Sequence, residues 1–181
     1  MLDRIDLFFE DPSVCHKPPR WYGVLYLLRR DIRTCLDIGS NAGAKTDCKA
    51  LWPGAMAIMA GIDLLAKFLA GSDSVGETGL RFRNFLGRYF KPISSDDATT
   101  IYQLRNALLH SFGLYSEHKG KVYRFTLTAV RRPLVQERAD DKYWIDILTL
   151  HDRFEAAVER YHADLGDDQD LQRNFDAVFP K

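Results

Sequence analysis

Apolar side chains recur every three or four residues in four segments near the start of the chain, which is the spacing of a helix that buries one face. The segments predicted as helices are residues 21–38, 55–70, 78–90 and 97–111. The second is apolar nearly all round, which is typical of a helix in the middle of a bundle. Four such helices in succession predict a helical bundle.

Beyond residue 111 the pattern changes from the period of a helix to that of a strand. Residues 112–115 and 122–130 carry β-forming side chains on either side of a turn at 118–120, and so predict a β-hairpin. Residues 143–147 have the same character and predict a further short strand. Helical spacing returns at residue 148, and a polar joint at 166–168 precedes a last short helix.

The expected fold is therefore mainly α: a helical bundle of four core helices plus C-terminal helices, with an inserted β-hairpin or small antiparallel sheet. We find no internal repeat, no low-complexity tract and no linker long enough to divide the chain. The predicted organisation is a single domain over residues 1–181, a β-rich insert at about 112–147 and C-terminal helices at about 148–179.

Composition favours a soluble domain in a reducing compartment. A chain of 181 residues with 46% hydrophobic side chains buries a full core without disulfides or structural metals. Cys15, Cys35 and Cys48 are an odd number at spacings that match neither a zinc site nor a disulfide framework, so we expect no metal and no cofactor. The weaker alternative is a zinc ion held by these cysteines with His16. The first residues lack a signal-peptide pattern, and no stretch reaches about 18 uncharged apolar residues, so we expect a cytoplasmic protein without a membrane partner.

Charge is balanced overall but unevenly spread. The chain has 25 basic and 25 acidic residues, yet residues 137–181 carry 12 acids and 6 bases, which leaves an excess of six positive charges on the rest. Residues 78–93 contain four basic side chains and no acid. This stretch is either a local site for a polyanion or an ordinary solvated face.

The most informative segment reads Arg-Asn-Ala-Leu-Leu-His, from Arg105 to His110, at the end of the fourth predicted helix. At about 100° per residue, Asn106 and His110 share a face about 40° wide, whereas Arg105 and His110 are about 140° apart. One helix alone is therefore not expected to bring the arginine and the histidine together. Two copies packed about a twofold axis would bring both pairs into one cleft.

Arginine, a polar residue, three more residues and histidine, late in a bundle helix, resemble the R-x4-6-H motif of HEPN domains. The glycine-containing helix at residues 60–65 and the aromatic and basic helix at 81–85 are also similar to helices of that family. The resemblance covers about residues 20–115; the β-rich insert and the acidic C-terminal helices depart from the minimal bundle. It implies a homodimeric, metal-independent endoribonuclease of bacterial type, often the toxic member of a toxin and antitoxin pair or part of a defence system.

The chemistry of RNA cleavage agrees with this resemblance. Attack by the 2′-hydroxyl needs a proton acceptor, a proton donor for the leaving 5′ oxygen and a cation for the charge on phosphorus. An imidazole suits both proton transfers, which assigns them to His110. Arg105 carries a planar charged fork that fits phosphate oxygens, and Asn106 would orient the phosphate or the histidine. RNA contacts are expected at Arg81, Arg83 and Arg88, with Tyr102 and Tyr115 as stacking surfaces.

Less specific interpretations explain the same residues. His110 is favoured at a helix C-terminus by the helix dipole, and Arg105 could pair with a core carboxylate such as Asp63. For Asp63 itself we favour neutralisation by Lys67, four residues on, over a role behind Arg105. The alternative functions are a non-catalytic HEPN-like dimer that binds a nucleotide, RNA or a partner protein such as an antitoxin, and a structural assembly module. Three further histidines are expected to be surface or hydrogen-bonded polar residues: His118, His151 and His162.

Overall fold

The computed structural model describes residues 4–12, 23–38 and 49–179. Over these residues the chain is mainly α, as predicted, with seven helices and one four-stranded sheet. The helices are α1 (Arg4–Phe9), α2 (Val24–Cys35), α3 (Leu51–Ala70), α4 (Thr78–Tyr89), α5 (Ser95–His110), α6 (Ile147–Asp167) and α7 (Gln169–Val178). The strands are β1 (Tyr115–His118), β2 (Lys121–Thr128), β3 (Val135–Arg138) and β4 (Lys142–Asp146).

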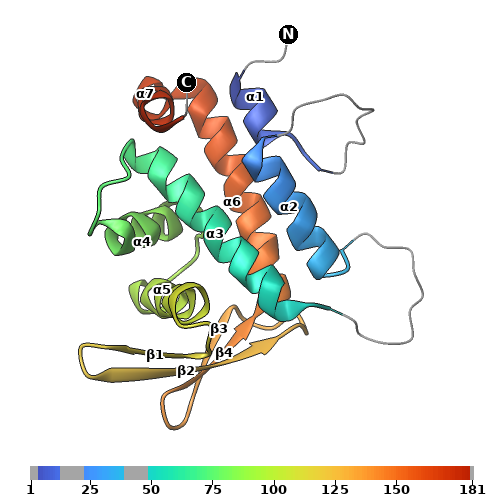
Figure 1. Ribbon diagram of the computed structural model, residues 1–181, viewed down its shortest axis with the longest axis vertical. Helices are drawn as coiled ribbons and strands as arrows, with labels where there is room; N and C mark the ends of the chain where they lie inside the picture. Colours follow the sequence, from blue (N-terminus) through green and yellow to red (C-terminus); the bar gives the residue numbers. More distant parts are fainter. Residues whose placement is uncertain (1–3, 13–22, 39–48, 180–181) are drawn as a thin grey trace.

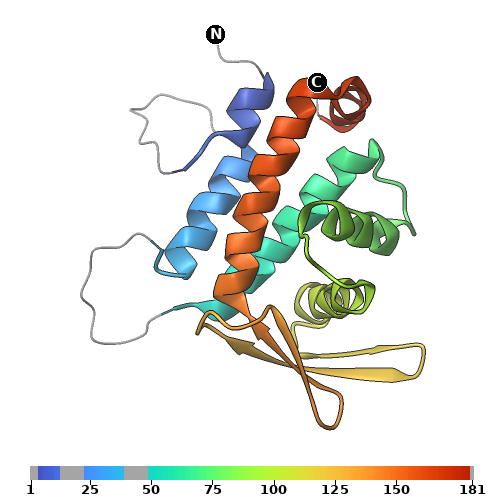
Figure 2. The ribbon, with the colours of Figure 1, turned by 180° about the vertical axis from the view of Figure 1, so that it is seen from behind.

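Helix α3 is the centre of the helical part, as its apolar sequence predicts. It packs against α2, α4, α5, α6 and α7, and Figure 1 shows it crossing in front of α6. Figure 2 shows α6 from the other side, running beside α2 from the top of the molecule down to the sheet. The two long helices approach closely at Gly61, where an added Cβ would lie 2.6 Å from Cζ of Phe154. Glycine at this position therefore sets the spacing between α3 and α6.

The sheet lies across one end of the helices, next to α5 and the start of α6 (Figures 1 and 2). Its strand order is β1-β2-β4-β3, and β2 pairs with β4 in parallel whereas the other two pairings are antiparallel. The predicted antiparallel sheet is therefore wrong in one pairing, and β3 was not predicted. Its four residues, Val-Gln-Glu-Arg, lack the alternation that identifies a strand.

Asp146, at the end of β4, fixes the junction between the sheet and α6. Its Oδ2 accepts hydrogen bonds from the hydroxyl of Thr128 at 3.1 Å and the amide of Val130 at 2.8 Å. Its Oδ1 accepts from the amide of Thr149 at 2.9 Å and so caps α6. These bonds hold the pKa of the carboxyl below its ordinary value although burial opposes them.

The helix bounds differ from the predictions mainly at the N-termini. Helix α1 was not predicted, because six residues are too few for a clear helical period. Helix α3 begins at Leu51, ahead of the prolyl residue in its first turn, where the missing N–H has no intrahelical acceptor to lose. Helix α5 begins after Ser94, whose Oγ accepts a hydrogen bond from the amide of Asp97 at 3.0 Å. The first two residues of the first predicted helix, 21 and 22, lie outside the described residues.

Helix α3 is the one described helix that is long and apolar enough, by length and composition, to cross a membrane. From the sequence we expected no stretch of about 18 apolar residues without a charge. Helix α3 does not break that expectation, because it contains Asp63 and Lys67, but it is apolar enough overall to meet the less strict criterion. Half of the apolar window is buried inside the molecule, and core helices of soluble proteins pass the same test.

Candidate functional site

Arg105 on α5 lies against Asp63 on α3. Its Nε donates to Oδ2 of Asp63 at 2.8 Å, and its Nη2 donates to the same oxygen at 2.5 Å. The preferred pairing of Asp63 with Lys67 is wrong, because Nζ of Lys67 instead lies 2.7 Å from Oδ2 of Asp73. Arg105 and Asp63 are both nearly buried, with side chains only 11% and 15% exposed. The ion pair fixes one edge of the guanidinium against the central helix.

The remaining guanidinium nitrogen, Nη1 of Arg105, faces His110 and Asn106. It is in hydrogen-bond contact with Nε2 of His110 and donates to Oδ1 of Asn106 at 3.3 Å. The expectation that one helix does not bring the arginine and the histidine together is therefore wrong. Side chains on a helix lean toward its N-terminus, so His110 at the end of α5 leans back over the turn that carries Arg105. The long arginine side chain spans the rest of the angle.

The contact defines the role of Nε2 of His110. A guanidinium has only donors, so Nε2 is the acceptor in this hydrogen bond. His110 is exposed, whereas Arg105 is buried. The site therefore presents a solvent-accessible base beside a fixed positive charge.

A pocket of about 330 Å³ opens beside Arg105. Apolar side chains of α3 and α5 line it together with one threonine, Thr78, and five charged residues: Asp63, Lys67, Asp73, Arg81 and Arg105. Burial raises the pKa of the Asp63 carboxyl above its ordinary value, and this outweighs the opposite effect of Arg105. Asp63 is thus a weaker acid than its ion pair alone would make it.

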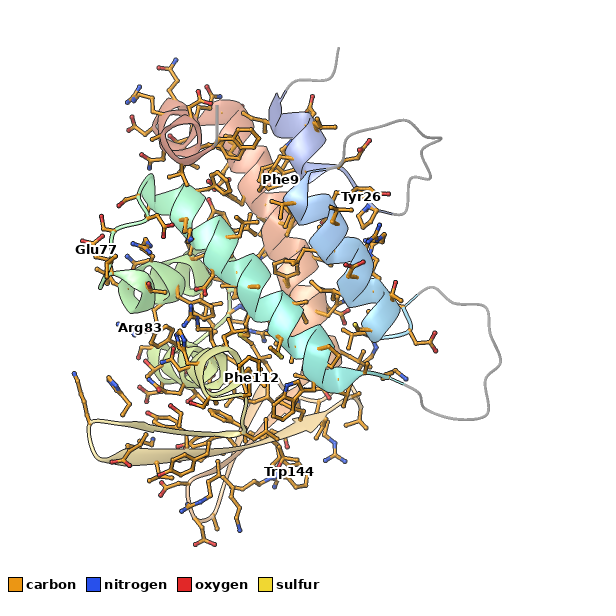
Figure 3. The ribbon with its side chains drawn as sticks, viewed as in Figure 1. Phe9, Tyr26, Glu77, Arg83, Phe112 and Trp144 are labelled. Atoms are coloured by element: carbon orange, nitrogen blue, oxygen red, sulfur yellow. The ribbon has the colours of Figure 1, made fainter. Side chains whose placement is uncertain are left out.

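The basic residues predicted to contact RNA do not form one surface. Arg81 lies in the pocket with Arg105 but is 6% exposed, and its Nη1 donates to the carbonyl of Ser74 at 2.8 Å. Arg83 is partly buried, with its guanidinium carbon 5.3 Å from the ring centre of Tyr102 (Figure 3). Arg88 lies in a different hollow. The structure brings Arg81 close to Arg105 but separates Arg88 from it.

The surroundings of Arg88 are acidic. Its Nη2 lies 3.3 Å from Oδ2 of Asp164 and 3.8 Å from Oδ2 of Asp168. Asp167 and Asp170 line the same hollow. The segment around Arg88 has no acid in its own sequence, but the fold places the acidic C-terminal helices against it.

The aromatic residues near the site differ in exposure. Tyr102 packs against the ring of Phe82 and against Gly79, where an added Cβ would lie 2.9 Å from its hydroxyl. Tyr115 on β1 is 50% exposed. Phe112, two residues beyond His110, is 73% exposed and was predicted only as part of a strand. The one signal in the sequence that would have drawn attention to Phe112 is its position just after the motif that ends at His110.

A second cluster of arginines, a carboxylate and a histidine lies between α2 and α6. Glu155 accepts a hydrogen bond from Nη2 of Arg29 at 2.7 Å and from Nη2 of Arg33 at 3.0 Å. His151 is 5% exposed, so of the two expected positions it is not the one at the surface; its Nδ1 lies 3.4 Å from Oδ1 of Asp152. Its Nε2 has no hydrogen-bond partner in the described part of the chain and lies 3.9 Å from Oε1 of Glu155.

The proposed zinc ligands cannot be placed together. Cys35 is a free thiol at the end of α2, whereas Cys15, His16 and Cys48 lie outside the described residues. Within residues 4–12, 23–38 and 49–179, no group of three or more potential ligands is close enough to hold a metal ion.

Comparison of the chain with models of protein families, with curated proteins and with solved structures finds no match.

Proposed function

We propose that this protein is a HEPN-type, metal-independent endoribonuclease that acts in the cytoplasm as a homodimer, in a toxin and antitoxin pair or a defence system. The observation that carries this proposal is the contact between Arg105 and His110, with Arg105 held from behind by Asp63. The contact places an exposed imidazole beside a fixed guanidinium, and these are the two groups that 2′-hydroxyl attack on phosphorus requires.

His110 takes the proton of the 2′-hydroxyl in the proposed reaction. Nε2 accepts a hydrogen bond from Arg105 in the free protein, so its lone pair is available once the substrate displaces that contact. As the O2′–H bond breaks, O2′ forms a bond to phosphorus and the P–O5′ bond breaks. The products are a 2′,3′-cyclic phosphate and a free 5′-hydroxyl.

Arg105 stabilises the charge that develops on the phosphate oxygens. Its Nε and Nη2 remain bound to Asp63, so Nη1 is the donor that turns toward the phosphate. Because Asp63 holds the guanidinium in place, little reorganisation is needed during the reaction. Asn106, whose Oδ1 accepts from the same nitrogen, would maintain the direction of Nη1.

The homodimer follows from the geometry of the displacement. In-line attack places O2′ and O5′ on opposite sides of phosphorus, so one imidazole does not reach both. A second copy of the chain would supply a second His110, which starts as the imidazolium and gives its proton to O5′ as that oxygen leaves. The proton taken from O2′ and the proton given to O5′ then balance over the two histidines.

Cleavage of a labelled single-stranded RNA in the presence of a chelator tests the proposal. We expect wild type to form 2′,3′-cyclic phosphate ends and H110A to lower the rate about 10²- to 10⁴-fold. His118, exposed on β1, provides a matched control, and H118A should cleave like wild type. Equal rates for wild type and H110A would refute the proposed role of His110.

A second candidate function is a non-catalytic dimer that binds a nucleotide, RNA or an antitoxin protein. It is favoured by the fact that Asp63, Asn106 and His110 together engage all three nitrogens of Arg105. In this case RNA binds wild type and H110A equally and neither protein cleaves it. If R105A loses its fold rather than its activity, the structural interpretation is correct instead.

A further inference from the structure

Phe112 has an unusual backbone conformation. Its φ angle is 46°, in the left-handed region that bulky residues avoid. The other described non-glycine residues with positive φ are aspartate, lysine or arginine: Asp37, Lys119, Arg131, Asp140 and Asp141. Phe112 is therefore the one apolar side chain of the described ranges in this conformation.

The conformation itself serves to end α5. The chain turns back after Ser111, and the amide of Gly113 donates to the carbonyl of Ala107 at 3.0 Å. Glycine is the usual residue for a left-handed helix end because it lacks a Cβ. The backbone thus gives no reason for phenylalanine at position 112.

Packing does not explain the phenylalanine either. Its side chain is 73% exposed, and Figure 3 shows it just beyond the end of α5. Nearby in the sequence, Ser111, Glu117 and His118 are exposed and polar, and Tyr115 is a second exposed aromatic residue at 50%. An exposed ring that the core does not use fits a flat ligand of similar size.

We propose that Phe112 is the stacking platform for an unpaired base of the RNA whose phosphate meets Arg105 and His110. This inference rests on the proposed function and specifies its substrate as single-stranded. Two Cα–Cα steps of about 3.8 Å separate Phe112 from His110, so the Cα atoms of the two residues are at most about 8 Å apart. In a nucleotide the base is one sugar away from its phosphate. A π-face is common to all bases, so the platform confers a preference for unpaired RNA and not for a sequence.

Binding of an unstructured, fluorescently labelled RNA oligonucleotide tests this inference, with H110A as the background so that the RNA is not cut. F112Y keeps an aromatic ring and should bind within about twofold of its parent. F112L and F112G should weaken binding about 5- to 150-fold, the loss expected for one stacked base. The salt dependence should not change, because the ring neutralises no phosphate.

Stability supplies the control. F112G relieves the left-handed strain, so its Tm should equal or exceed that of the parent while its affinity for RNA falls. A structural role for Phe112 predicts the reverse, a lower Tm with unchanged affinity. A role at an interface between two copies predicts that F112G shifts the dimer toward monomer in sedimentation. Either result would overturn the inference.

The failure of this inference is distinguishable from failure of the proposed function. If wild type cleaves RNA and F112L binds it as tightly as the parent, only the platform is wrong. If wild type neither cleaves nor binds single-stranded RNA, the proposed function is wrong and the platform with it.

Discussion

The molecule contains two clusters of arginine, carboxylate and histidine that differ in how many cations each carboxylate meets. Glu155 accepts from Arg29 and Arg33, and these bonds hold the pKa of its carboxyl below its ordinary value. Among the described residues, Asp63 accepts hydrogen bonds from Arg105 only, and burial raises the pKa of its carboxyl. The first arrangement is typical of a structural cluster. The second leaves one guanidinium nitrogen directed at an exposed histidine.

The histidines of the two clusters, His151 and His110, differ in their exposure to solvent. His151 is buried, and burial lowers its pKa despite the nearby Glu155. His110 is exposed at a helix end and in contact with Arg105. Arginine, carboxylate and histidine in proximity are thus not enough to indicate a reactive site. The accessible histidine is what distinguishes the Arg105 cluster.

The largest expected effect is a difference in unfolding free energy between variants of Arg29 and Arg105, one arginine from each cluster. R29M should cost about 3–5 kcal/mol of unfolding free energy, because Arg29 is 2% exposed and also donates to the carbonyls of Phe9 and Glu10. R105M should cost less, about 1.5–3 kcal/mol, because Asp63 then takes up a proton readily. Urea denaturation measures both.

Arg30 provides the control for these variants. It pairs with its neighbour Asp31 at the surface, with both side chains more than half exposed, so R30M should change stability by no more than about 0.5 kcal/mol. Equal losses in R29M and R105M would show that the two clusters are energetically alike, and the comparison would fail.

Gly61 tests whether both clusters depend on the spacing between α3 and α6. In G61A the new Cβ would lie 2.6 Å from Phe154 and 3.0 Å from Cδ2 of Leu28, so α6 and α2 must shift. We expect a loss of about 1–3 kcal/mol by thermal or urea unfolding. Gly87 on α4 has nothing within 4 Å of its added Cβ, and G87A should gain about 0.5–1 kcal/mol. A stable G61A would mean that the helices tolerate a wider spacing.

Local patterns in the sequence predicted most of the fold. Apolar periodicity located five of the seven described helices, and polar residues at 166–168 located the break before α7. The parallel pairing of β2 with β4 was not predictable, because it depends on the crossover at residues 129–134 and on Asp146, which binds two residues far from it in sequence, Thr128 and Val130. Alternation within a strand contains no information about its partner.

The candidate site was predicted only where it depends on residues close together in the sequence. The motif located Arg105, Asn106 and His110 from residues within one turn and a half of helix. The pairing of Asp63 with Arg105 joins residues 42 positions apart, and the local rule for charges four residues apart favoured Lys67 instead. Phe112 was overlooked because its exposure and its φ angle are properties of the folded chain only.

The pH dependence of stability should have opposite signs for the two carboxylates. Asp63 has a raised folded pKa, so the folded state binds more protons, and its contribution to stability falls as the pH rises above 3.8, the ordinary value. Glu155 has a lowered folded pKa, so its contribution is present above 4.5 and is lost as the pH falls through the folded value.

Urea unfolding between pH 3 and 7 measures these contributions as differences from D63N and E155Q. Relative to D63N, wild type should lose stability as the pH rises; relative to E155Q, wild type should lose stability as the pH falls. The pKa of His151 is also lowered, so this residue should have the same sign as Glu155. Relative to H151Q, wild type should lose stability as the pH falls below 6.5, the ordinary pKa of histidine. The same sign for D63N and E155Q would contradict the distinction between the clusters.

Arg88 should give the smallest effect and define where the candidate site ends. Its pair with Asp164 joins side chains that are 43% and 44% exposed, so R88A should cost no more than about 0.5 kcal/mol. The surrounding aspartates repel a polyanion, so affinity for single-stranded RNA and its salt dependence should equal those of wild type. A contact with phosphate predicts instead a weaker affinity and a salt slope smaller by about one. That result would extend the RNA path across α4 to the acidic helices, and the basic segment would act as one surface although its arginines lie in separate surroundings.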